Sequence, residues 1–273
     1  MNRIVVILLF ISFSFISCIK NEDYETEVKV NAGTLTFDFK HTVDNMQLQK
    51  DTMLYYNAAG NKYSISEIKY FISEVVLYHN GQKFTIQNWK WQHYVDIDIP
   101  STLTWQVFDK IDENKYDSLA FIFGIRSEKN KSFMFVNPPE VNMMWPDVLG
   151  GGYHYLMING KWKKPDNSER FFNFHLGIGQ IYDGTTFSVD SIKRFVDNSF
   201  RVSFPKASFR MVKDKNIKLI FTMNLNSWFT SPNIYNHDYW GGDIMQKQSA
   251  MQAGKENGYD VFSIQIDSSA LQK

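Results

Sequence analysis

Short stretches in which apolar and polar residues alternate constrain the fold of this chain more than any other feature. In residues 35–41 the alternation places Leu35, Phe37, Phe39 and His41 on one face of an extended strand, so that His41 continues an apolar face. The aromatic content of 16% favours strands that pack in a sheet interior. Further strands are predicted at residues 92–99, 116–125, 154–158, 170–176, 200–204, 217–225 and 260–266.

Turn and helix signals complete the predicted architecture. Asn80-Gly81 separates two apolar runs and predicts a type I′ hairpin, with His79 exposed at its mouth. Residues 64–70 are read as one or two helical turns, and residues 243–255 as the one clear helix, with Asp243 as its cap and Gly258 at its exit. We predict an all-β fold, an antiparallel β-sandwich with one short C-terminal helix.

The first 30 residues have the features of an export and anchoring segment. Residues 1–17 contain Arg3 and a short apolar run, as a secretion signal does, and Cys18 stands where bacterial lipoproteins are cleaved and lipidated. Residues 18–30 are predicted to be a flexible tether. Their lysine and acidic residues resemble the surface-export signal of Bacteroidetes lipoproteins, although an ordinary solvated linker has the same composition.

Residues 31–267 are predicted to form a single β-rich domain, because no internal repeat or linker interrupts them. After removal of the signal and use of Cys18 as the lipid anchor, no cysteine remains for a disulfide, so packing must stabilise the domain. The 29 basic and 29 acidic residues balance, which argues against a nucleic-acid-binding protein.

Two histidines are predicted to meet on one sheet. His154 and His175 lie in two strand-like runs joined by a polar turn, and parity places His154 with Leu156 and Ile158. Neutral imidazole is a common ligand for copper, zinc, iron and nickel, although a histidine on an apolar face is more often a core residue. Parity places His175 on one face with Phe171 and Asn173. Gly150, Gly151 and Gly152 precede His154 and allow a sharp bend of the backbone. Further candidate donors are the thioethers of Met143, Met144 and Met157, and His237 in the aromatic loop 232–242.

A family resemblance extends through nearly the whole mature chain. The segments that carry it are residues 37–41 (FDFKH), 56–60 (YNAAG), 63–73 (YSISEIKYFIS), 144–146 (MWP), 151–154 (GGYH), 174–177 (FHLG) and 257–262 (NGYDVF). In this order and spacing the sequence resembles the MbnP-like family of secreted or lipid-anchored proteins.

The resemblance implies a sandwich-like domain that binds one copper ion through two histidines, together with a kynurenine formed from tryptophan. It also implies a dihaem peroxidase-like partner for that oxidation. Carried over to this chain, His154 and His175 are the expected ligands, His41 and His237 are further candidates, and Trp145 is the expected modified tryptophan. In the family the tryptophan stands two residues before a ligand histidine, and this spacing occurs here only in Trp91-Gln92-His93.

These observations lead to three functional hypotheses. The first is a non-enzymatic, copper-binding lipoprotein anchored in the cell envelope, expected in the outer membrane and exposed at the cell surface, since the sequence contains no hydrolase motif. The second is a glycan-binding or adhesion lipoprotein that uses the aromatic residues of the 232–242 loop. The third is a redox enzyme that uses copper.

Overall fold

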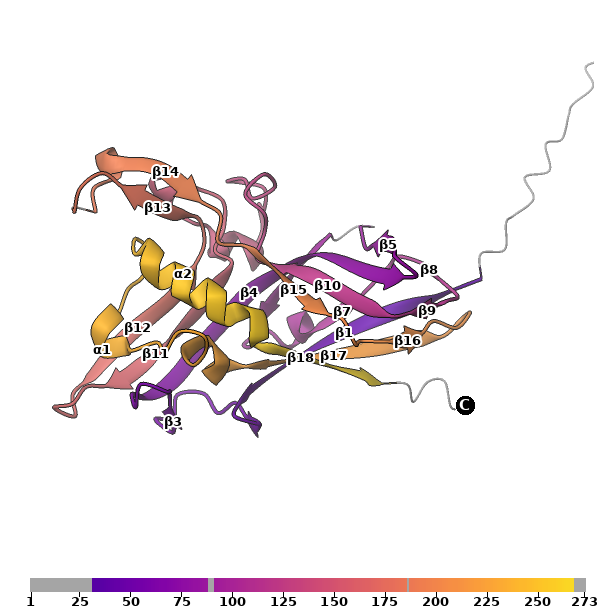
Figure 1. The fold of residues 1–273 in the computed structure, drawn as a ribbon, viewed down its shortest axis with the longest axis horizontal. Coiled ribbons are helices and arrows are strands. Elements are labelled where there is room, and N and C mark those ends of the chain that lie inside the picture. The colour runs from indigo at the N-terminus through magenta and orange to yellow at the C-terminus, as the bar shows by residue number, and fades with distance from the viewer. Residues whose placement is uncertain (1–30, 88–90, 186, 268–273) are drawn as a thin grey trace, which may run out of the picture. The chain divides into compact units, whose positions relative to one another are not determined.

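The computed structural model describes residues 31–87, 91–185 and 187–267. The predicted signal sequence, Cys18 and the tether lie outside these ranges. All described residues belong to one compact unit, which is shown in Figure 1.

Two sheets form the main layers (Figure 1). The larger sheet has the antiparallel order β12 (Glu169–Leu176), β11 (Leu156–Lys163), β4 (Lys62–His79), β10 (Ser118–Phe123) and β15 (Phe200–Phe204), and β4 also pairs with β3 (Tyr55–Tyr56), β5 (Gln82–Thr85) and β6 (Gln92–Asp96). The smaller sheet has the order β18 (Phe262–Asp267), β17 (Asn216–Asn224), β1 (Ala32–Val43) and β2 (Met46–Gln47), with β7 (Thr104–Gln106) and β8 (Ile111–Asp112) also paired to β1. Only β1 and β17 run parallel among these pairs.

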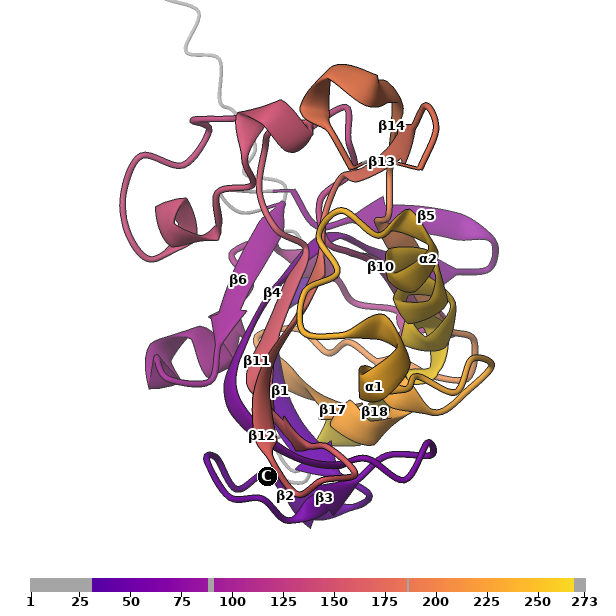
Figure 2. The same ribbon diagram turned by 90° about the vertical axis from the view of Figure 1, so that its left-hand side faces the viewer.

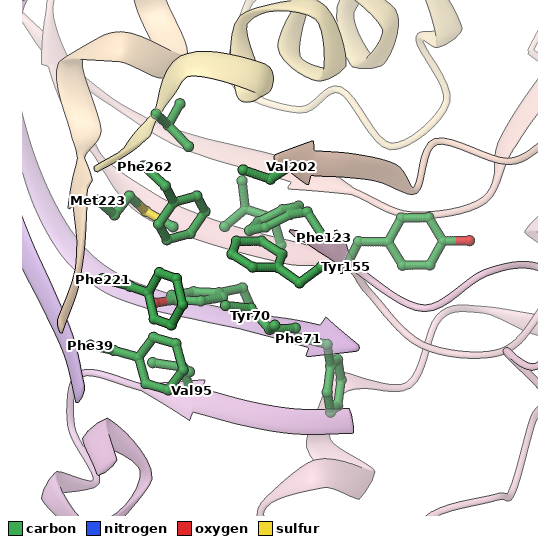
Figure 3. Close-up of a cluster of buried hydrophobic side chains, with 14 of the residues drawn as sticks. Phe39, Tyr70, Phe71, Val95, Phe123, Tyr155, Val202, Phe221, Met223 and Phe262 are labelled. Atoms are coloured by element: carbon green, nitrogen blue, oxygen red, sulfur yellow. The ribbon is translucent and has the colours of Figure 1, made fainter. Parts of the chain in front are cut away.

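Aromatic side chains from the two sheets meet in the core. Phe121 of β10 lies edge-on to Phe221 of β17 and to Phe262 of β18, with ring centroids 5.6 and 5.4 Å apart. Figure 3 shows Phe39 and Phe221 of the smaller sheet beside Tyr70 of the larger one. Offset and edge-on ring pairs add to the stabilisation from burial of apolar area. The predicted all-β sandwich is therefore confirmed.

The long strand β4 corrects one prediction. Residues 64–70, which were read as helical turns, are part of this strand. Its pairing with β11 contains an extra residue between Ile65 and Ile68, and its pairing with β10 contains another irregularity. Each bulge advances the buried positions by one residue, so Ile65, Ile68, Ile72 and Val75 follow one another at intervals of three and four. This spacing imitates the period of a helix.

The Asn-Gly hairpin is confirmed. Strand β4 ends at His79 and β5 begins at Gln82, and the two turn residues Asn80 and Gly81 have φ angles of 47° and 77°. Positive φ at both positions defines the type I′ turn. Two small ribbons lie outside the main sheets, one formed by β13 (Gly179–Tyr182) and β14 (Ile192–Val196), the other by β9 (Lys115–Tyr116) and β16 (Phe209–Arg210).

The C-terminal helix is present but shorter than predicted. Helix α2 spans Gln248–Asn257 and leads into Gly258, whereas the predicted cap Asp243 pairs instead with Asn173 of β12. A second helix, α1, spans His237–Trp240, and no helix in the described part of the chain is long and apolar enough to cross a bilayer. The 3₁₀ helices span Pro100–Leu103, Glu140–Met143, Asp147–Leu149, Val189–Ser191, Leu225–Phe229 and Gly258–Asp260. Figure 2 shows α1 and α2 on one side of β11 and β12.

Candidate metal site

The β11–β12 hairpin brings the predicted histidine segments together. Met157 pairs with His175, and Asn159 pairs with Asn173. Leu156 and Ile158 are buried toward the core, so Met157, Asn159 and His175 share the opposite face of the sheet. We call this the outer face.

His154 lies next to His175, but not for the predicted reason. Strand β11 begins at Leu156, and before it the backbone N–H of His154 donates to the carbonyl of Met143 at 2.7 Å. The parity of the strand therefore does not extend to His154, and the prediction that it faces the same way as Leu156 and Ile158 was wrong. The two imidazole rings meet edge to face on the outer face, with centroids 5.0 Å apart and an interplanar angle of 86°.

Three consecutive glycines shape the segment before His154. Gly150, Gly151 and Gly152 all have positive φ, at 115°, 68° and 80°. A Cβ at Gly152 would lie 2.6 Å from the side chain of Asn130, so no other residue fits that turn. The turn returns the chain so that the carbonyl of Gly152 accepts from the backbone N–H of Trp145 at 2.8 Å.

This turn packs Trp145 against the histidine pair. Its indole is fully buried, its Nε1 donates to the carbonyl of Leu149 at 3.2 Å, and its ring centroid lies 4.6 Å from that of His154. Nine residues separate Trp145 and His154 in sequence, yet their rings are in contact. The other candidate spacing, Trp91 and His93, lies elsewhere, since His93 stacks against Trp105 with centroids 5.0 Å apart.

Hydrogen bonds fix the proton of the His154 ring. Its Nδ1 lies 2.9 Å from the carbonyl oxygen of Met143, which can only accept, so Nδ1 carries the hydrogen. A neutral imidazole has one ring proton, and Nε2 therefore keeps its lone pair. Nε2 is buried and has no hydrogen-bond partner among the described residues.

The same reasoning fixes the ring of His175 through two further side chains. A carboxylate oxygen of Glu67 accepts from the Asn159 amide nitrogen, so the amide oxygen of Asn159 faces His175. That oxygen lies 2.6 Å from Nε2 of His175, which must donate. Nδ1 of His175 then keeps its lone pair, and it too is buried without a partner in the described structure. Lys69 forms an ion pair with the other oxygen of Glu67.

Burial keeps both rings neutral. It lowers the pKa of His154 to about 4, and burial together with the neighbouring His154 and Lys69 lowers the pKa of His175 to about 3. His154 and His175 are 6% and 7% exposed. At neutral pH two lone pairs are thus available to a cation, without a proton to displace.

The other two predicted ligand candidates lie on the core side of the sheet. His41 is buried against Tyr70, with its Nε2 3.1 Å from the hydroxyl. His237 is fully buried over Phe172, with ring centroids 4.4 Å apart. Since Tyr70 and Phe172 point into the core, neither histidine joins the pair on the outer face.

Few side chains at the histidine pair could bind a metal ion. Within the described ranges, no group of three or more His, Cys, Asp or Glu side chains is arranged to hold a metal ion. Imidazole is a ligand for copper, as it is for zinc, iron and nickel, so the two neutral rings are compatible with a copper ion. Met157 occupies the register position opposite His175 on the same face, so a thioether is also close in the sheet.

The aromatic 232–242 loop offers less surface than the glycan hypothesis expected. Tyr235 is buried against Phe174 and Phe229, and Trp240 is half-buried and stacks on Tyr235. Tyr239, at 75% exposed, is the aromatic side chain of the loop that projects into solvent.

Sequence reasoning missed Glu67 and Asn159. Parity assigns Asn173 to the face of His175, but the partner strand and its register cannot be read from parity. The available signal was Asn159, a polar residue that directly follows the apolar Ile158 in the predicted strand region.

Comparisons with known proteins give one family and one solved structure. A family model described as MbnP matches residues 32–248. The solved structure of MbnP from Methylosinus trichosporium superimposes with a TM-score of 0.53 at 15% sequence identity, covering 88% of this chain and 100% of that one. This similarity supports the fold. No curated protein sequence matches the chain.

Proposed function

This chain belongs to the MbnP family, and from that premise we propose that it binds a copper ion through His154 and His175. In this proposal the protein is an envelope-anchored lipoprotein, attached through Cys18, that acquires or handles copper. It acts as a binding protein and not as an enzyme.

The observation that carries the proposal is the pair of unpartnered ring nitrogens. Nε2 of His154 and Nδ1 of His175 are buried in adjacent rings. A buried polar atom without a partner costs about 1–3 kcal/mol, so two such atoms in adjacent rings need an explanation. A copper ion between them would satisfy both lone pairs.

The residues around the pair have roles that suit a bound ion. The Met143 carbonyl and the Asn159 amide hold the ring protons away from the ligating nitrogens. Trp145 and the surrounding buried side chains limit the access of water. The copper itself is the cargo, and these residues orient its ligands.

Copper titration of variants tests the proposal. The metal-free protein is titrated with Cu(I) in competition with a chromogenic chelator, and we expect one ion per chain. His154→Ala and His175→Ala are each expected to abolish the tight site. His79→Ala is the matched control, because His79 lies at the Asn-Gly hairpin and bonds the Lys115 carbonyl. Unchanged stoichiometry and affinity in both site variants would refute these ligands.

Trp145 extends the proposal to a modification. Its contact with His154 supports Trp145 as the tryptophan converted to kynurenine by a dihaem peroxidase-like partner. Peptide mass spectrometry of protein purified from its native envelope tests this, and an unmodified Trp145 in copper-loaded protein would contradict it.

A further inference from the structure

The hydrogen bonds of His175 continue beyond the histidine pair. The chain of contacts runs from the Lys69 ammonium to the Glu67 carboxylate, then to the Asn159 amide, and ends at Nε2 of His175. These four residues come from three neighbouring strands of the larger sheet and share its outer face. The chain is therefore built into the register of the sheet.

We propose that Glu67 and Asn159 are positioning residues that set the tautomer of His175, with its proton on Nε2 and its lone pair on Nδ1. This inference rests on the proposed copper site and adds the residues that select the ligating nitrogen. Neither residue contacts the ion in this account.

The direction of the chain follows from which groups can donate. An ionised carboxylate can only accept hydrogen bonds, so Glu67 forces the amide nitrogen of Asn159 toward itself. The amide oxygen then faces the ring at 2.6 Å and accepts from Nε2. Lys69 binds the remaining oxygen of Glu67, so that each carboxylate oxygen of Glu67 has its own donor.

His154 reaches the same result by a simpler route, because a backbone carbonyl accepts its Nδ1 proton at 2.9 Å. The two rings consequently use different nitrogens, Nε2 in His154 and Nδ1 in His175. A side-chain relay can be removed by substitution, whereas the carbonyl cannot. His175 is thus the ring whose orientation can be tested.

The first test measures the tautomer in the metal-free protein. ¹⁵N NMR of labelled histidine distinguishes the two neutral tautomers, and His175 of the wild type is expected to be protonated on Nε2. Asn159→Leu removes the acceptor, and we expect a mixture of both tautomers. Glu67→Ala leaves the Asn159 amide free to rotate. We expect it to give some of the Nδ1-protonated form of His175, but a smaller proportion than Asn159→Leu gives.

Asn173→Leu is the matched control. Asn173 pairs with Asn159 across the strands and is also half-buried on the outer face, but its amide bonds Asp243 at 2.6 Å. It should leave the tautomer of His175 unchanged. A pure Nε2-protonated His175 in folded Asn159→Leu and Glu67→Ala proteins would overturn the proposal.

The second test measures Cu(I) affinity by chelator competition. Removal of a group that orients a ligand typically weakens metal binding about 10- to 100-fold, and we expect Asn159→Leu to fall in that range while Asn173→Leu stays within about twofold of wild type. An affinity of Asn159→Leu equal to that of the control would overturn the relay. Because the tautomer is read without metal, a protein that bound no copper would refute the proposed function and leave the NMR result interpretable.

Discussion

Replacement of His237 by leucine should stabilise the protein. His237 has no exposed surface, and its two ring nitrogens have no hydrogen-bond partner in the described part of the chain. Aromatic rings surround it, with Phe172, Phe229 and Tyr235 at centroid distances of 4.4, 5.1 and 5.3 Å. The backbone N–H of residue 237, which donates to Asn61, is unaffected by the substitution.

The expected effect at pH 8 is the difference of two contributions. Removal of the unsatisfied polar ring atoms stabilises the folded state by about 1–3 kcal/mol. Loss of the ring contacts costs about 0.5–1.5 kcal/mol. The net expectation for His237→Leu is a gain of about 1 kcal/mol in the free energy of unfolding.

The gain should increase at acid pH. Burial lowers the pKa of His237 in the folded state to about 3, below the unfolded value of 6.5. As the pH falls below 6.5, the unfolded wild type binds a proton that the folded wild type does not, so the wild type loses stability. At pH 5, about 1.5 pH units below the unfolded pKa, this loss is about 2 kcal/mol. The leucine variant lacks the group, so its advantage should reach about 3 kcal/mol at pH 5.

Urea denaturation at pH 8 and pH 5 measures both quantities. His41→Leu is the comparison variant, since His41 is a buried histidine with a partner, the hydroxyl of Tyr70 at 3.1 Å. Its removal leaves that hydroxyl unpaired, so the variant should lose about 1–3 kcal/mol at pH 8. If His237→Leu were less stable than wild type at both pH values, or if its advantage were the same at both, the reasoning would be refuted.

Two further predictions concern the histidine pair. Because burial lowers the pKa values of His154 and His175 to about 4 and about 3, Cu(I) affinity should stay constant between pH 5 and pH 8 in chelator competition, and a decline beginning near pH 6.5 would contradict the burial argument. In Gly177→Ala the new Cβ would lie 2.5 Å from Cε3 of Trp145, so the indole must move from His154. We expect a loss of about 1–3 kcal/mol in urea denaturation and about tenfold weaker copper binding. Gly184→Ala, where the Cβ meets nothing within 4 Å, should leave copper binding unchanged.

The sequence predicted the elements whose signals are local. The Asn80-Gly81 turn follows from the positive φ that these residues tolerate, and the alternation from Leu35 to His41 matches the buried face of β1. Where a bulge interrupts the alternation, as in β4, the same reading gave a helix. The helix start at Asp243 was wrong because Asp243 bonds Asn173 of a distant strand, which no local pattern records.

The candidate site was predicted in part for a similar reason. His154 and His175 belong to neighbouring segments, and their proximity follows from a hairpin. The side on which His154 lies depends on where β11 begins, and parity assumed that the strand continued two residues too far. Glu67 reaches the site from β4, about 90 residues earlier in the chain, so only the register of the larger sheet brings it there.

The position of the histidine pair on the outer face has a consequence for redesign. Leu156, Ile158, Phe174 and Leu176 pack into the sandwich interior from the other side of β11 and β12, so exchanging half-buried side chains on the outer face leaves those contacts in place. A library that varies Met157, Asn159 and Asn173 would sample other metal preferences on an unchanged scaffold. The choice of side chains at these three half-buried positions can therefore be made without rebuilding the contacts between the two sheets.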